Sequence, residues 1–385
     1  MTTLVRRVGL AVGAALALAV GSFAPTAHAD SMDPTPGRFV LQPSGLPHGF
    51  TCQSIAANPA AFVHANPKLV PNNFACLPDN AAFQNFVSEL GFAIAPTAFH
   101  PARTTGFGGF NFSFEASYTK INQDAADVNG TQYWHAGTQG AQNPNTGNGS
   151  ATNTAPDSII QVYSMKARKG LPLGFEITGD LSYIANTVMW TAGADIRWAL
   201  MEGFRTGWPA YLPDVSVGGG VRTLTGTSQF SLTTVGIDAQ ISKPITLADT
   251  SVITPYVGYQ RLYIFGDSST VSLAPNTDPL KQCYSNQNPS APAILPNGQP
   301  NCGNIPGTST TNNGAFNNDV TFNQVRTNRH RGIVGLNYRY EILYLAGQFL
   351  MDLTPPNAEN PPLSTATGAS QPRQWTISLE AGVYF

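Results

Sequence analysis

Hydrophobic and polar residues alternate over the last twelve positions of this chain, QWTISLEAGVYF, from Gln374 to Phe385. Every second side chain from Trp375 onward is apolar, and those between are mostly polar or small. A period of two is typical of a β-strand with one apolar and one polar face. The chain is therefore predicted to end in a strand rather than in a polar tail.

The same alternation recurs along the chain. Regular examples lie at residues 110–119, 174–184, 190–200, 215–222, 234–241 and 334–340, and less regular ones at 158–168, 252–266 and 342–353. With the terminal strand this makes ten segments, most of them 11 or 12 residues long. Strands of soluble proteins average five or six residues. Twelve residues at about 3.4 Å each, tilted by about 40 to 45°, cover the roughly 30 Å of a bilayer's hydrocarbon core. The pattern predicts an all-β fold, an antiparallel transmembrane β-barrel.

The number of strands depends on the amino-terminal part. Residues 90–99 read as an eleventh strand, and an even number then requires a twelfth around residues 38–42. We predict about 12 strands, within a range of 10 to 14. In the alternative, residues 30–100 form a periplasmic or plugging segment on a ten-stranded barrel, with short helices at 54–67 and 80–90.

The connections set the orientation of this barrel. Outer-membrane barrels have short periplasmic turns and longer external loops. If the last strand ends in the periplasm, the three long connections 122–157, 267–328 and 354–373 are all external, whereas the join near Tyr340 and Glu341 is short and periplasmic. We expect an amino-terminal segment at 30–109, either a plug or a first hairpin, and the barrel at 110–385.

The first 29 residues have the parts of a signal peptide. Arg6 and Arg7 precede an apolar run from Val8, and Ala27-His28-Ala29 matches a cleavage site. Cleavage removes two arginines, which leaves 18 Lys and Arg against 22 Asp and Glu, a net charge of about −4. Charged residues are only 11% of the chain, and the balance argues against nucleic acid as a partner.

Charged residues occupy the polar faces of the predicted strands. A charge against lipid costs about 2–4 kcal/mol at mid-depth, so these side chains are expected to line the lumen. They either pair in a filled interior or line a narrow, wet channel. The predicted lumen charges are Glu115, Glu176, Asp180, Asp195, Arg197, Arg222, Asp238, Arg339 and Glu380. Aromatic residues near strand ends suit the interfacial girdles of a barrel: Tyr118, Tyr183, Trp190, Trp198, Trp375 and Phe385.

Four cysteines in an exported protein predict disulfides. Cys52 and Cys76 share the amino-terminal segment, and Cys283 and Cys302 share one external loop, so two local bridges are favoured. No C-x-x-C spacing indicates zinc, and no metal or cofactor is expected. The histidines stand in no catalytic or metal-binding motif, so an enzyme is not predicted.

The signal peptide, the alternating segments and the closing GVYF resemble a Gram-negative outer-membrane β-barrel protein of the porin-like class. The resemblance implies a location in the outer membrane, contact with its lipid, and recognition of Tyr384 and Phe385 by the barrel assembly machinery. NPAA at 58–61 is also similar to the amino terminus of fatty-acid transporter barrels, from which we infer no substrate. The favoured function is a narrow channel for a small solute, and the alternatives are a structural or surface-interaction barrel and a barrel enzyme. The oligomeric state and the solute stay open.

Overall fold

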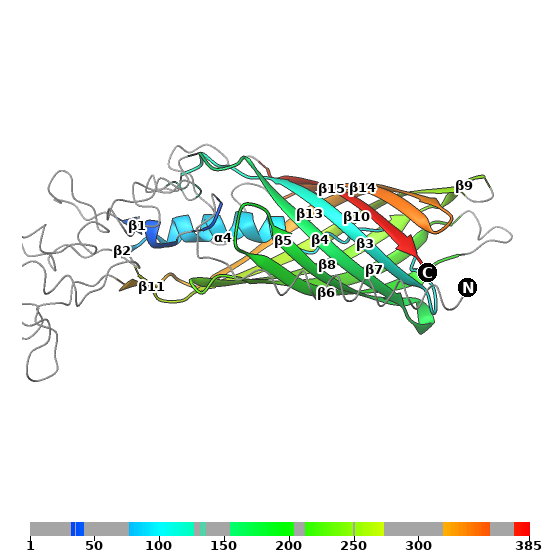
Figure 1. Ribbon diagram of the computed structural model, residues 1–385, viewed down its shortest axis with the longest axis horizontal. Helices are drawn as coiled ribbons and strands as arrows, with labels where there is room; N and C mark the ends of the chain where they lie inside the picture. Colours follow the sequence, from blue (N-terminus) through cyan, green and yellow to red (C-terminus); the bar gives the residue numbers. More distant parts are fainter. Residues whose placement is uncertain are drawn as a thin grey trace, which may run out of the picture.

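The computed structural model describes residues 32–34, 36–41, 77–126, 132, 134, 155–203, 212–248, 251–272, 319–354 and 373–385. Ten long antiparallel strands lie in the order β13-β14-β15-β3-β4-β5-β6-β7-β8-β10, and pairing of β10 with β13 closes the barrel (Figure 1). This confirms the predicted antiparallel transmembrane β-barrel, at the lower limit of the expected strand number. The bounds are β3 (Phe110–Lys120), β4 (Ile159–Gly170), β5 (Phe175–Ile184), β6 (Trp190–Met201), β7 (Asp214–Thr225), β8 (Phe230–Ser242), β10 (Ser251–Ser268), β13 (Val325–Tyr340), β14 (Leu343–Asp352) and β15 (Trp375–Tyr384).

The two faces of the barrel follow the alternation in the sequence. Along β15, Ser378 and Glu380 are buried on the inner face, whereas Ile377 and Leu379 are exposed on the outer face. The other long strands repeat this arrangement, so the outer wall is mainly apolar and the inner wall mainly polar. An apolar wall of this kind suits contact with lipid, because lipid-facing and lumen-facing side chains alternate in membrane barrels.

The two ends of the barrel differ. At one end, which we call the turn end, Glu341 and Ile342 alone join β13 to β14, and a 3₁₀ turn, η3 (Pro172–Gly174), joins β4 to β5. The carboxyl terminus lies at this end (Figure 1). The three long connections, from β3 to β4, from β10 to β13 and from β14 to β15, all leave from the opposite end, which we call the loop end.

One helix, α4 (Asn80–Ile94), lies at the loop end along the barrel axis (Figure 1). It begins where the Asp79 side chain accepts a hydrogen bond from the amide of Ala82 at 3.2 Å, which satisfies one of the free amides of the first turn. It ends shortly before Pro96, since a proline disfavours helical backbone in the residue that precedes it. No helix within the described ranges is long and apolar enough to cross a membrane.

The amino-terminal residues considered for two further strands do not join the barrel. Within 90–99, the first five residues belong to α4, and the last five form neither helix nor strand. Near residue 40, β1 (Val40–Leu41) pairs only with β2 (Leu77–Pro78). Four short elements complete the described part: η1 (Pro36–Arg38), β9 (Ile245–Ala248) beside β10, and β11 (Val271–Ser272) paired with β12 (Asp319–Val320). The signal peptide and the helix expected at 54–67 lie outside the described residues.

Candidate functional site: a barrel lumen occupied by its own chain

The helix α4 is seated tightly in the loop end of the barrel. Its aromatic side chains pack with those of the wall; Phe83, for example, lies edge-on to Phe230 of β8 with ring centroids 6.4 Å apart. Two glycines mark the closest approach to β10. A Cβ at Gly91 would lie 2.5 Å from Ile264, and a Cβ at Gly266 would lie 2.5 Å from Val87. Neither position has room for a larger side chain, so the two glycines allow the helix backbone to pack directly against β10.

Glu89 ties the helix to the loop end through polar contacts. The indole of Trp134 donates a hydrogen bond to its carboxylate at 2.6 Å, and the side-chain amide of Asn122 donates another at 2.8 Å. Burial raises the pKa of Glu89, and these hydrogen bonds oppose that shift. These donors stabilise the buried carboxylate of Glu89 and fix its position, because burying a carboxylate without hydrogen-bond donors would be costly.

Residues 95–109 connect the end of α4 to the start of β3 at the turn end, so this segment runs through the lumen. None of its residues pairs in a sheet, and side chains of the inner wall donate to its backbone oxygens instead. Arg331 donates to the oxygens of Phe92 and Pro96, Gln260 to Pro96 at 3.0 Å, Gln348 to Thr97 at 2.7 Å, Gln240 to Ala98 at 2.6 Å, Arg168 to Phe99 at 2.7 Å, and Arg197 to His100 and Pro101 at 3.1 and 3.0 Å. We call α4 and residues 95–109 the plug.

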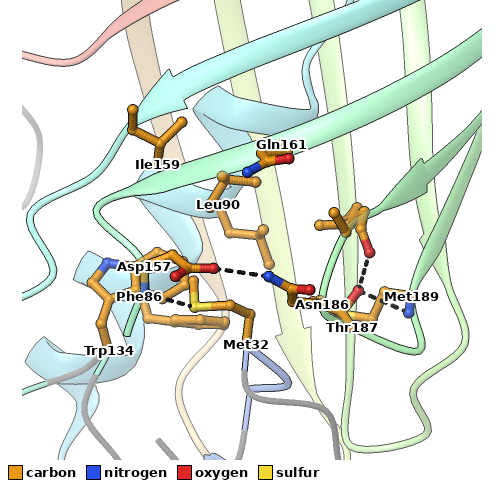
Figure 2. Close-up of a pocket in the computed structure, with 13 residues that line it drawn as sticks. Met32, Phe86, Leu90, Trp134, Asp157, Ile159, Gln161, Asn186, Thr187 and Met189 are labelled. Atoms are coloured by element: carbon orange, nitrogen blue, oxygen red, sulfur yellow. Dashed lines mark hydrogen bonds between the residues drawn. The ribbon is translucent and has the colours of Figure 1, made fainter. Parts of the chain in front are cut away.

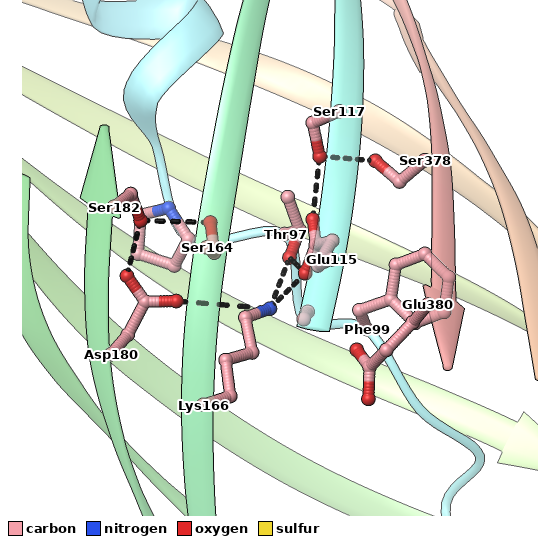
Figure 3. Close-up of polar contacts among 12 residues, drawn as sticks. Thr97, Phe99, Glu115, Ser117, Ser164, Lys166, Asp180, Ser182, Ser378 and Glu380 are labelled. Carbon is pink, nitrogen blue, oxygen red and sulfur yellow. Dashed lines mark hydrogen bonds and ion pairs between the residues drawn. The ribbon is translucent and has the colours of Figure 1, made fainter. Parts of the chain in front are cut away.

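Figure 3 shows an ion-pair cluster of the inner wall that contacts the plug. Lys166 pairs with Glu115, lies 4.0 Å from Asp180, and donates to the hydroxyl of Thr97 at 3.0 Å. The cluster continues to Arg222, which lies 3.2 Å from Asp180 and also pairs with Asp195 at 2.8 Å. Charges of opposite sign thus alternate across the inner wall, and the hydroxyl of Thr97 links this cluster to the plug.

Three further ion pairs lie inside the barrel. Arg168 pairs with Glu380 at 2.6 Å, and the Tyr344 hydroxyl donates to the same carboxylate. Arg329 pairs with Asp352 below α4, and Arg197 lies 3.5 Å from Asp238. In the plug, His100 lies 3.1 Å from Glu176 of β5.

Two small cavities lie beside the plug. A cavity of about 20 Å³ lies in the lumen beside Phe99, His100, Asp195 and Arg197. A second cavity of about 10 Å³ lies at the loop end, against Phe86 and Leu90 of α4 (Figure 2). A single water molecule needs roughly 10–15 Å³, so each cavity has room for no more than one or two waters. Neither is a continuous path through the barrel.

The structure brings most of the predicted lumen charges together. Glu115, Asp180, Asp195 and Arg222 belong to one connected cluster, and the remaining buried ones are Glu176, Arg197, Asp238 and Glu380. Asp195 keeps a quarter of its side chain exposed. Arg339 differs, because it is exposed at the turn end, where its guanidinium lies 4.5 Å from the centre of the Tyr384 ring.

Several residues that hold the plug were not predicted from the sequence. Lys166 and Arg168 belong to β4, whose apolar residues on both faces hid the alternation. Arg329 and Arg331 precede residue 334, where the predicted segment began, whereas β13 starts at Val325. Continuing the period of two backward from Val334 would have placed both arginines on the inner face.

The carboxyl-terminal pair occupies both faces of the wall. Tyr384 packs on Tyr344 with ring centroids 5.0 Å apart, whereas Phe385 is exposed and exchanges backbone hydrogen bonds with Phe110. This seals the last strand to the first at the turn end. Their role as an assembly signal stays a prediction. The four cysteines, Cys52, Cys76, Cys283 and Cys302, lie outside the described residues.

No family model and no curated protein matches this chain. Among solved structures, it is similar to the outer membrane protein OprG from Pseudomonas aeruginosa, with 10% identity over 73% of this chain and 98% of that chain and a TM-score of 0.25. The COG4313 outer membrane channel from Pseudomonas putida F1 is 9% identical over 74% and 98% of the two chains, with a TM-score of 0.25. Ail of Yersinia pestis is 8% identical over 72% and 99%, with a TM-score of 0.23. Scores this low support no argument. The strand pairing of the chain itself, with its apolar outer wall, identifies a closed transmembrane β-barrel whose lumen is occupied by its own amino-terminal segment.

Proposed function

We propose that this protein is an outer-membrane β-barrel that is closed by its plug and acts as a structural or surface-interacting barrel, without constitutive conductance and without catalysis. The apolar outer wall supports the membrane location. Outer-membrane lipid and the barrel assembly machinery are the partners that this proposal requires. The working surfaces are then the outer wall and the loop end, rather than the lumen.

One observation carries the proposal: the wall is built to hold the plug. Six consecutive plug residues, Pro96 to Pro101, accept hydrogen bonds from side chains of the inner wall through their backbone oxygens. If the plug left, each of these donors would lose an acceptor wherever water did not replace it. An unpaired buried polar group costs about 1–3 kcal/mol, and a stranded arginine costs more. Arg331 would be stranded, because its other acceptors are the plug oxygens of Phe92 and Pro96 and its contact on the wall is the neutral Gln260 side chain. Arg168 and Arg197 would keep their carboxylate partners on the wall but lose their plug acceptors. A resident plug is therefore favoured over an open pore.

A narrow channel for a small solute is the second candidate. It is favoured by the cavity beside Asp195 and by the polar contacts that hold residues 95–101, because polar contacts exchange with water more readily than apolar packing. In that case the plug would have to move, or loosen, during passage.

The two candidates are separated by a reversible lock on the plug. A Cβ at Gly266 would lie 3.4 Å from the Cβ of Val87, close to the mean of about 3.8 Å for disulfides. The double variant Val87→Cys/Gly266→Cys should therefore cross-link α4 to β10 on oxidation. Val87→Cys alone is the matched control, since it adds a thiol without a partner on β10.

Conductance and solute uptake are measured in planar bilayers and in vesicles, for the wild type and for both variants, before and after reduction. The closed barrel should show no stable conductance in any state, and its folded, heat-modifiable fraction should be unchanged. A stable open conductance of the folded wild type would refute the proposal. Uptake that stops on oxidation of the double variant, and returns on reduction, would establish the moving plug and the second candidate.

A further inference from the structure

The outer wall has few charged residues. Within the described strands, the charged side chains on outward positions are Lys120, Lys169, Arg261, Asp267 and Arg326. Four of the five lie at or next to a strand end. Arg261 is the exception, because β10 continues for seven residues beyond it, and its side chain is exposed between the buried neighbours Gln260 and Leu262.

The strand register places Arg261 high on the wall. A row of residues that lie opposite one another on adjacent strands starts at Phe110 of the turn end. It passes through Lys169, Ile177, Ile196, Gly219 and Ile237 to Arg261 and then to His330. With strands tilted by about 40° and spaced about 4.8 Å apart, each step along such a row climbs about 3 Å, so six steps climb about 18 Å. The apolar band of a membrane barrel is about 25 Å tall. Arg261 thus lies toward the loop-end boundary of the lipid, within reach of the headgroups.

Its neighbours form a basic and aromatic surface. The Arg261 guanidinium lies 5.2 Å from the centre of the Tyr263 ring, and the Tyr259 hydroxyl is hydrogen-bonded to Nδ1 of His330 across the strand pair. Arg326 lies on β13 opposite Phe265, four residues above Arg261 in register, and its guanidinium donates to the Gln324 side chain at 2.8 Å. Neither arginine has a carboxylate partner in the part of the chain that the structure describes. We call Tyr259, Arg261, Tyr263, Arg326 and His330 the girdle patch.

A cation on a lipid-facing wall needs an anionic partner. At the membrane boundary that partner is a headgroup phosphate, to which a guanidinium donates two parallel hydrogen bonds. Tyrosines suit the same level, since their rings contact acyl chains while the hydroxyl reaches polar groups. We propose that the girdle patch binds the phosphate of a lipid in the leaflet at the loop end, the outer leaflet in the proposed orientation. This inference rests on the membrane location in the proposed function and deepens it.

The test measures lipid binding to the full-length, folded protein. Purified protein in detergent is titrated with lipid A, a phosphorylated glycolipid, and bound lipid is counted by native mass spectrometry. Phosphatidylcholine, whose phosphate is offset by its own cation, is the comparison lipid. The variants are Arg261→Gln and Arg261→Gln/Arg326→Gln. Lys169→Gln is the matched control, because Lys169 is an outward cation at the turn end.

The wild type should prefer lipid A to phosphatidylcholine, and the double variant should bind lipid A about tenfold more weakly, as expected for loss of charge-assisted hydrogen bonds. Lys169→Gln should bind as the wild type does. Arg261→Lys, which keeps the charge but loses the paired donors, should have an affinity for lipid A between those of the wild type and Arg261→Gln. All substitutions lie on the outer wall, and heat-modifiable migration checks that each variant is folded.

Three results would overturn the inference. The first is equal lipid A binding by the wild type and the double variant, and the second is equal weakening by Lys169→Gln. The third is displacement of lipid A by inorganic phosphate at the same concentration, since it would indicate a site for free anions. These outcomes leave the conductance result untouched. A conducting wild type with an intact lipid preference would instead refute the closed barrel alone.

Discussion

Replacing Arg197 by glutamine is the sharpest test of a packed lumen. Arg197 has 6% of its side chain exposed, and its guanidinium donates to the backbone oxygens of His100 and Pro101 and to the Gln240 side chain. The same group lies 3.5 Å from the carboxylate of Asp238, which is equally buried. Arg197→Gln would leave that carboxylate in the lumen without its cation.

The expected loss of stability follows from these contacts. Removing one partner of a buried ion pair costs about 3–5 kcal/mol, and one hydrogen bond from the new amide returns about 1 kcal/mol, so a net loss of about 2–4 kcal/mol is expected. Arg339→Gln makes the same chemical change at an exposed site and should cost less than about 1 kcal/mol. The double variant Arg197→Gln/Asp238→Asn should lose less than the sum of its single variants, because it leaves no unpaired charge.

Urea unfolding in lipid vesicles, followed by tryptophan fluorescence, measures these differences, and the same samples are tested for conductance. The packed lumen predicts a destabilised variant that conducts neither before nor after the change. If Arg197→Gln unfolds at the wild-type urea concentration, the guanidinium is solvated and the packed interior is wrong. If the wild type conducts ions and Arg197→Gln changes its ion selectivity, the packed interior is also wrong.

Three other predictions address separate parts of the molecule. Gly91→Val should loosen α4, because its Cβ would lie 2.5 Å from Ile264, and protease cleavage of the plug should become faster than in the wild type; unchanged cleavage would contradict the close packing. Deleting Phe385 should lower the amount of heat-modifiable protein in the membrane, since it removes the backbone pairing that joins the last strand to the first; normal levels would argue against an assembly role. Peptide mapping without reduction should find Cys283 joined to Cys302, and a bridge from either one to the amino-terminal cysteines would disprove the local pairing.

The strands and their faces were determined by the sequence itself. A period of two is a local property of extended backbone, so Leu379 outward and Glu380 inward could be read from neighbouring letters alone. The same holds for the inward positions of Glu115, Asp180 and Arg222. Strand length likewise indicated a membrane barrel without any contact between distant residues.

Only the tertiary structure decided how many strands close the barrel and what occupies it. Residues 90–99 alternate well enough for a strand, but strand or plug depends on partners that lie far away in the sequence. The donors to this segment come from six different strands, and their spacing follows from barrel closure, which no local pattern encodes. The same physical reason explains why Lys166 and Arg331 were missed as plug contacts. Lys166 donates to the hydroxyl of Thr97, and Arg331 donates to the carbonyl of Pro96. Both acceptors are more than 60 residues away in the chain and come close only when the barrel closes around the plug.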